Sequence, residues 1–216
     1  MNPQNSSAST SRTDKRQVVL WGISHPAQRG DWTVSQKEIE LFSAQIRNLA
    51  IIHKVSGIAE EMSLEAMQTW KATEILAQQG KRYFQENERM AIIHDLQGIP
   101  LPSITEKAAR DIGIQYAACD PDSVEQKARG IRAADLYHFD LILNKTDDLR
   151  DPEDRWRAET FPQREEIWIE HLIKFDCWPV LFLCGKEHVE GFARRLQSHG
   201  IGVEVLGDSG DQVPSR

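Results

Sequence analysis

Short apolar segments alternate with longer amphipathic ones along most of this chain. Runs of apolar or β-branched residues bounded by polar residues or glycine predict strands, and five segments have this pattern: 17–22, 55–61, 113–119, 179–184 and 202–206. Apolar residues at helical spacing fill the intervals, in 34–50, 63–79, 103–112, 163–175 and 189–199. Strands that alternate with helices are typical of an α/β fold with a mostly parallel sheet covered by helices. Ligands of such folds bind at the carboxyl ends of the strands, so we expect the site there.

The pattern predicts a single domain over residues 17–206, because no linker interrupts it. Residues 1–16 and 207–216 are polar and are expected to form flexible tails. Residues 120–162 are rich in Arg and Asp. This segment is either a solvated excursion with short helices or a lid over the site.

Composition excludes several classes of protein and ligand. Of the 216 residues, 40% are hydrophobic and 27% charged, which is typical of a globular chain. A net charge of −7 argues against a nucleic-acid backbone as the main partner. No apolar run approaches the ~20 residues of a membrane span. The three cysteines contain no C-x-x-C pair, which favours a reducing compartment. We therefore expect a cytoplasmic protein with neither nucleic acid nor membrane as partner.

Two predicted strands end in the same motif, four apolar residues followed by G-x-x-H. Gly22 and His25 end the first strand, and Gly185 and His188 end the fourth. One such match carries little weight in a chain with 13 glycines and 7 histidines, but two at similar strand ends indicate a function. Glycine permits a sharp exit from the strand. Each histidine is then expected to lie over the carboxyl edge of the sheet.

Acidic residues end two further predicted strands. Glu60 and Glu61 follow one another, so their side chains point to opposite faces and one of them is expected to face the site. Asp120 follows the third strand, where its Asp-Pro-Asp-Ser context also fits a turn and a helix cap.

The helix predicted over 163–175 carries an arginine on its apolar face. Arg164 precedes Ile167 by three residues and Trp168 by four, so the three side chains share one face. An arginine on a stripe that faces the core needs a carboxylate or an anionic ligand. Alternatively, its head group extends to solvent at the start of the helix.

In this order, the motifs resemble the superfamily that contains the TraB/PrgY/GumN proteins, the Tiki proteases, the erythromycin esterases and the ChaN-like haem-binding lipoproteins. The similarity extends through residues 18–206, although Trp168 and Ile169 replace the usual Met-Ala pair. The resemblance implies the same α/β fold, a site at the strand ends and, more loosely, hydrolytic chemistry. The positions that carry it are Gly22, His25, Glu61, Met62, Asp120, Arg164, Glu165, Glu166, Gly185 and His188.

These residues predict a hydrolase for a small-molecule or peptide substrate. Either His25 or His188 would activate water as a general base, and Glu61 would orient it. Arg164 would hold a developing anion. His25, Glu61 and His188 also have the ligand types of a zinc, manganese or iron site. The remaining candidates, for substrate binding, are Arg29, Glu60, Asp120, Glu165 and Trp168.

The alternative is a non-catalytic module that binds a ligand or haem in the same pocket, with a histidine as the iron ligand. On either hypothesis, His25, Glu61 and His188 should converge, and Arg164 should pair with Glu60, Glu61 or Asp120. Replacing either histidine with alanine should change stability by no more than about 1 kcal/mol, as for residues that serve a pocket and not the core. The oligomeric state is left open.

Overall fold

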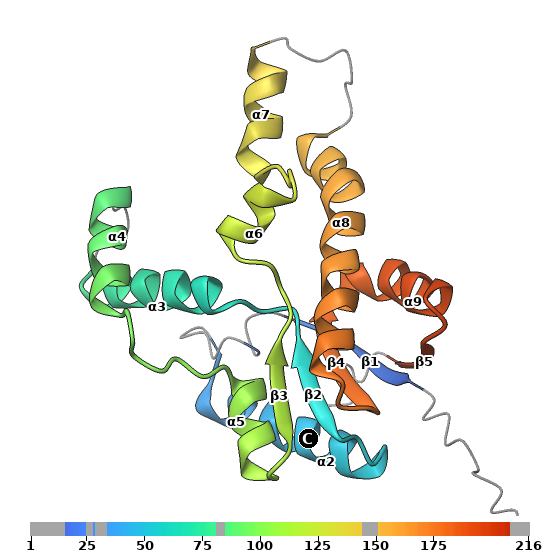
Figure 1. Ribbon diagram of the computed structural model, residues 1–216. Coiled ribbons are helices and arrows are strands. Elements are labelled where there is room, and N and C mark those ends of the chain that lie inside the picture. Colours follow the sequence, from blue (N-terminus) through green and yellow to red (C-terminus); the bar gives the residue numbers. More distant parts are fainter. Residues whose placement is uncertain (1–15, 25–27, 29–33, 81–84, 144–150, 208–216) are drawn as a thin grey trace, which may run out of the picture.

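The computed structural model describes residues 16–24, 28, 34–80, 85–143 and 151–207 (Figure 1). His25, Arg29 and nearly all of the two predicted tails lie outside the described residues. None of the described helices combines the length and the apolar content that a membrane span needs.

Five parallel strands form one sheet in the order β3-β2-β4-β1-β5, which confirms the predicted α/β fold. Each predicted strand is present and its ends shift by at most two residues. The central strand, β4, is buried along its whole length because it is paired on both sides and covered on both faces. The strands are β1 (Gln17–Ile23), β2 (Gly57–Glu60), β3 (Gln115–Ala118), β4 (Val180–Gly185) and β5 (Gly202–Leu206).

Helices cover both faces of the sheet (Figure 1). Side chains on one face, such as Leu20 and Phe182, pack against α8 (Pro152–Phe175) and α9 (Val189–Ser198). Alternate side chains, such as Val19, pack on the other face against α2 (Gln36–Ile52) and α5 (Ile104–Asp111). The alternation of side chains along each strand therefore divides the core into two layers.

Serine caps fix the starts of three helices that the sequence predicts. Ser35 caps α2, and Ser63 caps α3 (Leu64–Gln78). The Oγ atom of Ser103 accepts a hydrogen bond from the backbone N–H of Glu106, as expected for α5. Each cap satisfies an N–H group that has no partner within its helix.

α8 begins eleven residues before its predicted start at Gln163. Pro162 lacks the N–H that an interior helical residue donates, so a helix boundary is expected there, but α8 continues through it. The helix starts instead at Pro152, a position where the N–H is not needed. The Asp151 side chain caps this start by accepting from Glu153 N. Packing of α7 (Ala134–Ile142) along the first half of α8 supports the longer helix.

The segment 120–162 contains short helices, as the first alternative predicted. α6 (Ser123–Ala128) is held to α8 by a bidentate ion pair, with Arg129 Nη1 and Nη2 at 3.1 and 2.6 Å from the Glu170 carboxylate. With α7 and the first half of α8 it forms a column beyond the carboxyl edge of the sheet (Figure 1). The lid hypothesis stays a prediction.

α4 (Glu86–Asp95) was not predicted. None of its residues is buried, so it has no apolar stripe from which a helical period could be read. It packs on α3, and the two helices form an arm beside the column of α6 and α7 (Figure 1).

Candidate functional site

A pocket of about 700 Å³ lies at the carboxyl edge of the sheet, where such folds bind their ligands. Its wall is formed by the ends of β1 and β4, by the residues after β2 and β3, and by the first half of α8. A hollow of similar size, about 690 Å³, lies elsewhere, between α2, α3 and α5. The carboxyl-edge pocket is lined by Ile23, Ser24, Glu61, Met62, Ala66, Asp120, Glu153, Trp156, Arg157, Phe161, Arg164, Gly185, Lys186, Glu187 and His188.

Glu61 is buried at the centre of this edge, and each of its carboxylate oxygens accepts a hydrogen bond. The backbone N–H of Gly185 lies 2.8 Å from Glu61 Oε2, because β2 and β4 are neighbours and place their ends side by side. Arg164 Nη2 lies 2.7 Å from Glu61 Oε1. Glu61 therefore joins two strand ends to α8.

Arg164 also binds Asp120, the residue that follows β3. Its Nε and Nη2 atoms lie 3.0 and 2.7 Å from Asp120 Oδ1, and the indole nitrogen of Trp168 lies 3.1 Å from the same oxygen. Burial raises the pKa of Asp120, and Arg164 opposes this effect. Burial alone would lower the pKa of Arg164, but Asp120 and Glu61 together raise it, so the guanidinium stays charged. The predicted pairing of Arg164 with carboxylates at the strand ends is confirmed.

His188 lies in a single 3-10 turn, η1 (Lys186–His188), which follows β4. Its Nδ1 atom is 3.0 Å from Glu165 Oε1, and its Nε2 atom is 3.4 Å from Glu61 Oε1. Phe161 stacks on the imidazole ring with a centroid distance of 3.7 Å. The sequence had assigned the orienting role to Glu61, whereas the shorter contact to His188 comes from Glu165.

A second arginine holds Glu165. Arg195, on α9, places its Nε atom 2.9 Å from Glu165 Oε2. Gly191 leaves the space for this carboxylate, since a Cβ atom at that position would lie 3.1 Å from both of its oxygens. Sequence reasoning missed both Gly191 and Arg195. The available signal was their spacing, since they follow the strand-end residue His188 by about one and two helical turns.

His188 is more deeply buried than expected, with only 3% of its surface exposed. The ring packs between Phe161 and Trp168 and contacts two carboxylates. The expectation that its loss would barely change stability is therefore revised, because truncation would remove packing and one polar contact of each of two buried acids.

Glu60 lies on the opposite side of β2, as the alternation of side chains predicted. It is fully buried and accepts hydrogen bonds from Ser103 Oγ, from Tyr116 OH at 2.6 Å and from Gln28 Nε2 at 2.5 Å. All three donors are uncharged. Burial raises the pKa of Glu60, although these hydrogen bonds oppose the shift.

Of the predicted substrate-binding residues described here, only Asp120 lines the pocket. Glu60, Glu165 and Trp168 are buried behind its wall. They hold other side chains in place in this structure, and substrate contact by them stays a prediction. Convergence of His25 with Glu61 and His188 also stays a prediction, since His25 lies outside the described residues.

The described residues do not fit a divalent metal by themselves. Within the described ranges no group of three or more His, Cys, Asp or Glu side chains has a metal-binding arrangement. Both oxygens of Glu61 accept N–H groups, and a guanidinium lies beside them. His188 Nδ1 is engaged by Glu165 at 3.0 Å, and Nε2 lies 3.4 Å from Glu61 Oε1.

Fold and site together define a parallel α/β protein with a histidine–carboxylate–arginine pocket at the carboxyl edge of its sheet. No protein-family model, curated protein or solved structure matches the chain. The resemblance to the TraB–Tiki–erythromycin esterase superfamily therefore stays a prediction based on the motifs alone.

Proposed function

We propose that this pocket is the active site of a hydrolase in which His188 transfers the proton of an attacking water. The observation that carries the proposal is the hydrogen bond between His188 and Glu165, with Nδ1 and Oε1 3.0 Å apart. A carboxylate that holds Nδ1–H leaves Nε2 as the atom that accepts a proton. His188 lines the pocket, so a water there is within reach of this ring.

Arg164 would stabilise the negative charge that develops on the substrate. Its Nε and Nη2 atoms are bound to carboxylates, whereas Nη1 makes no hydrogen bond to any residue that the structure describes. Arg164 lines the pocket. Because Asp120 and Glu61 fix its guanidinium, we expect Nη1 to act as a preorganised donor there. Preorganised donors of this kind stabilise an oxyanion without a cost of reorganisation.

Direct attack by water is favoured over a cysteine nucleophile. Cys119 and Cys184 are fully buried near the site, and burial raises the pKa of both thiols far above the usual range. A buried thiol with a raised pKa is a poor source of thiolate. The reaction class is therefore hydrolysis of an activated carbonyl or phosphoryl group by water.

A screen of ester, peptide and phosphoester substrates, with and without divalent ions, tests the proposal. On any substrate that is cleaved, His188→Gln and Glu165→Gln should each lower kcat by a factor of about 10²–10⁴. His199→Gln is the matched control, because His199 pairs with Glu166 on the surface and should keep full activity. A folded His188→Gln variant with undiminished kcat would remove His188 from the chemistry.

A binding module without catalytic activity is the second candidate. It is favoured by the mutual pairing of Glu61, Arg164 and Asp120, which satisfies most of their polar atoms without a substrate. Absorbance and metal content of the purified protein distinguish the two candidates. A Soret band would support the haem-binding alternative, whereas turnover by a metal-free, colourless sample would support the hydrolase.

A further inference from the structure

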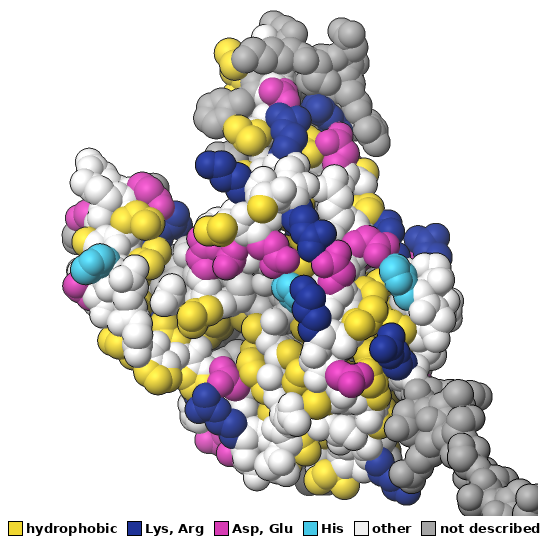
Figure 2. Space-filling model, viewed as in Figure 1, with side chains coloured by type: hydrophobic (Ala, Val, Ile, Leu, Met, Phe, Trp, Pro, Cys, Tyr) yellow, Lys and Arg dark blue, Asp and Glu magenta, His cyan; other side chains and the backbone are white. Residues whose placement is uncertain are grey.

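Two further hollows, of about 520 and 470 Å³, share lining residues with the pocket beside His188. Asp120 lines all three, and Ala66 also lines both the pocket and the first of these hollows. The larger of the two lies between α3, α4 and α6, where Figure 2 shows an indentation between the arm and the column. We call the pocket and the larger of these hollows the Asp120 groove. The smaller hollow, whose lining includes Asp122, Glu125 and His171, is not part of it.

Asp120 presents one free carboxylate oxygen at the junction. Its Oδ1 atom accepts all three hydrogen bonds from Arg164 and Trp168. Its Oδ2 atom accepts none from the residues that the structure describes, and it is not among their buried unpaired atoms. Asp120 and Arg164, which carry the acceptor Oδ2 and the donor Nη1, both line the pocket beside His188.

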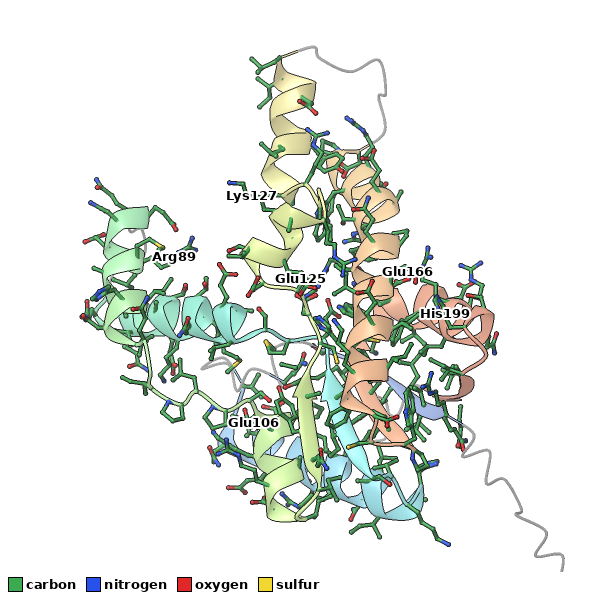
Figure 3. All side chains as sticks on the ribbon, viewed as in Figure 1. Arg89, Glu106, Glu125, Lys127, Glu166 and His199 are labelled. Carbon is green, nitrogen blue, oxygen red and sulfur yellow. The ribbon has the colours of Figure 1, made fainter. Side chains whose placement is uncertain are left out.

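The larger hollow, between α3, α4 and α6, is lined mainly by uncharged side chains. Apart from Asp120, its two charged side chains are engaged locally: Glu65 accepts Ser123 N at 2.5 Å, and Arg89 pairs with Glu86 at 2.5 Å. Figure 3 labels Arg89 on α4, which lines this hollow. The uncharged lining consists of Ser63, Ala66, Thr69, Trp70, Thr73, Pro121, Ser123 and Gln126.

Aromatic rings line the groove on both sides of Asp120. Trp70 is half-buried in the larger hollow, and Trp156 and Phe161 are half-buried in the pocket beside His188. Hydroxyl and amide groups suit a ligand whose own hydroxyls both donate and accept. Aromatic rings add flat apolar surface that such a ligand can cover.

We infer that the Asp120 groove binds an extended, uncharged oligosaccharide, with one sugar hydroxyl donating to Asp120 Oδ2 and another group accepting from Arg164 Nη1. A peptide is less suited, because extended peptides typically add to the edge of a sheet, whereas this groove crosses the ends of the strands. As an assignment of substrate class, the inference rests on the proposed hydrolase; as a binding site, it stands without it.

Calorimetric titration with chito- and cello-oligosaccharides of one to six units tests the inference. The wild type and the His188→Gln variant are both titrated, so that cleavage cannot obscure binding. We expect the affinity for at least one series to rise about tenfold or more between one unit and four. Trp70→Ala should reduce the gain with length by about tenfold and leave binding of the single unit unchanged.

Gln197→Ala, an exposed change on α9, is the control and should bind like the wild type. Trp70→Phe, which keeps an aromatic ring, should retain part of the gain if Trp70→Ala proves unstable in a thermal melt. Equal affinity for one unit and six, binding of an uncharged hexapeptide alone, or no binding of either would overturn the inference.

The two proposals can fail separately. Length-dependent binding without cleavage of any sugar or generic substrate would remove the hydrolase and keep the groove. Cleavage of a small ester without length-dependent binding would keep the hydrolase and remove the groove.

Discussion

Arg164 and Glu61 are 103 residues apart in the sequence, yet Arg164 Nη2 lies 2.7 Å from Glu61 Oε1. The same nitrogen lies 2.7 Å from Asp120 Oδ1, so one guanidinium joins α8 to the ends of β2 and β3. All three side chains are at most 14% exposed. At such burial each charge depends on the others, and loss of one partner leaves the rest uncompensated.

Arg164→Met should lower the free energy of unfolding by about 3–5 kcal/mol, because it leaves two buried carboxylates without their cation. Urea denaturation at pH 7 measures the change. Arg47→Met is the control: Arg47 pairs with Asp111 at 3.0 Å on the surface, and the loss of an exposed pair costs roughly 1 kcal/mol or less. Equal effects of the two substitutions would show that Arg164 is solvated in solution.

His188→Ala should cost more than the ~1 kcal/mol expected of a residue that serves only a pocket. The ring packs on Phe161 and binds Glu165, so its removal creates a cavity and leaves an acid without this partner. Thermal and urea unfolding would measure the loss. His199→Ala, on the surface, should stay within about 0.5 kcal/mol of the wild type; a similarly small change for His188→Ala would place that ring in solvent.

Arg195→Met should lower kcat on any cleaved substrate by about tenfold and leave KM nearly unchanged. Arg195 contacts Glu165, not the pocket, so we expect it to act by positioning the carboxylate that holds His188. The split between kcat and KM distinguishes positioning from substrate binding. Arg194→Met is the matched control. The side chain of Arg194, the residue before Arg195, is exposed and lies 3.7 Å from Glu190. A raised KM at constant kcat would contradict the positioning role.

Glu60→Gln should stabilise the protein at pH 8 relative to the wild type, and the benefit should shrink toward pH 4.5. Burial raises the pKa of Glu60 above its ordinary 4.5, so the folded state favours the protonated carboxyl. The stability that this group contributes is full below the unfolded pKa and is lost as pH rises through the folded pKa. Urea midpoints at pH 4.5, 6 and 8 would measure it.

Glu190→Gln, at an exposed position on α9, serves as the control for the Glu60 experiment and should show no such pH dependence. If Glu60→Gln destabilised the protein equally at all three pH values, the ionised form would be the one that the Ser103, Tyr116 and Gln28 network requires.

Local patterns along the chain predicted where the strands and most helices fall, because alternation along strands and 3.6-residue spacing along helices are local properties. For the same reason they predicted that Glu60 and Glu61 face opposite sides and that Glu61, Arg164 and His188 lie at one edge of the sheet. They did not reveal α4, which buries no residue, or the start of α8, where Pro162 suggested a boundary.

The partners of these residues depend on how distant segments pack together. The neighbouring positions of β2 and β4 bring Gly185 N to Glu61, and the packing of α8 and α9 brings Glu165 and Arg195 to His188. Strand order and helix packing result from contacts between distant segments, which no local period records. The imidazole was therefore predictable as a strand-end residue, but its carboxylate partner, its burial and the groove beyond Asp120 were not.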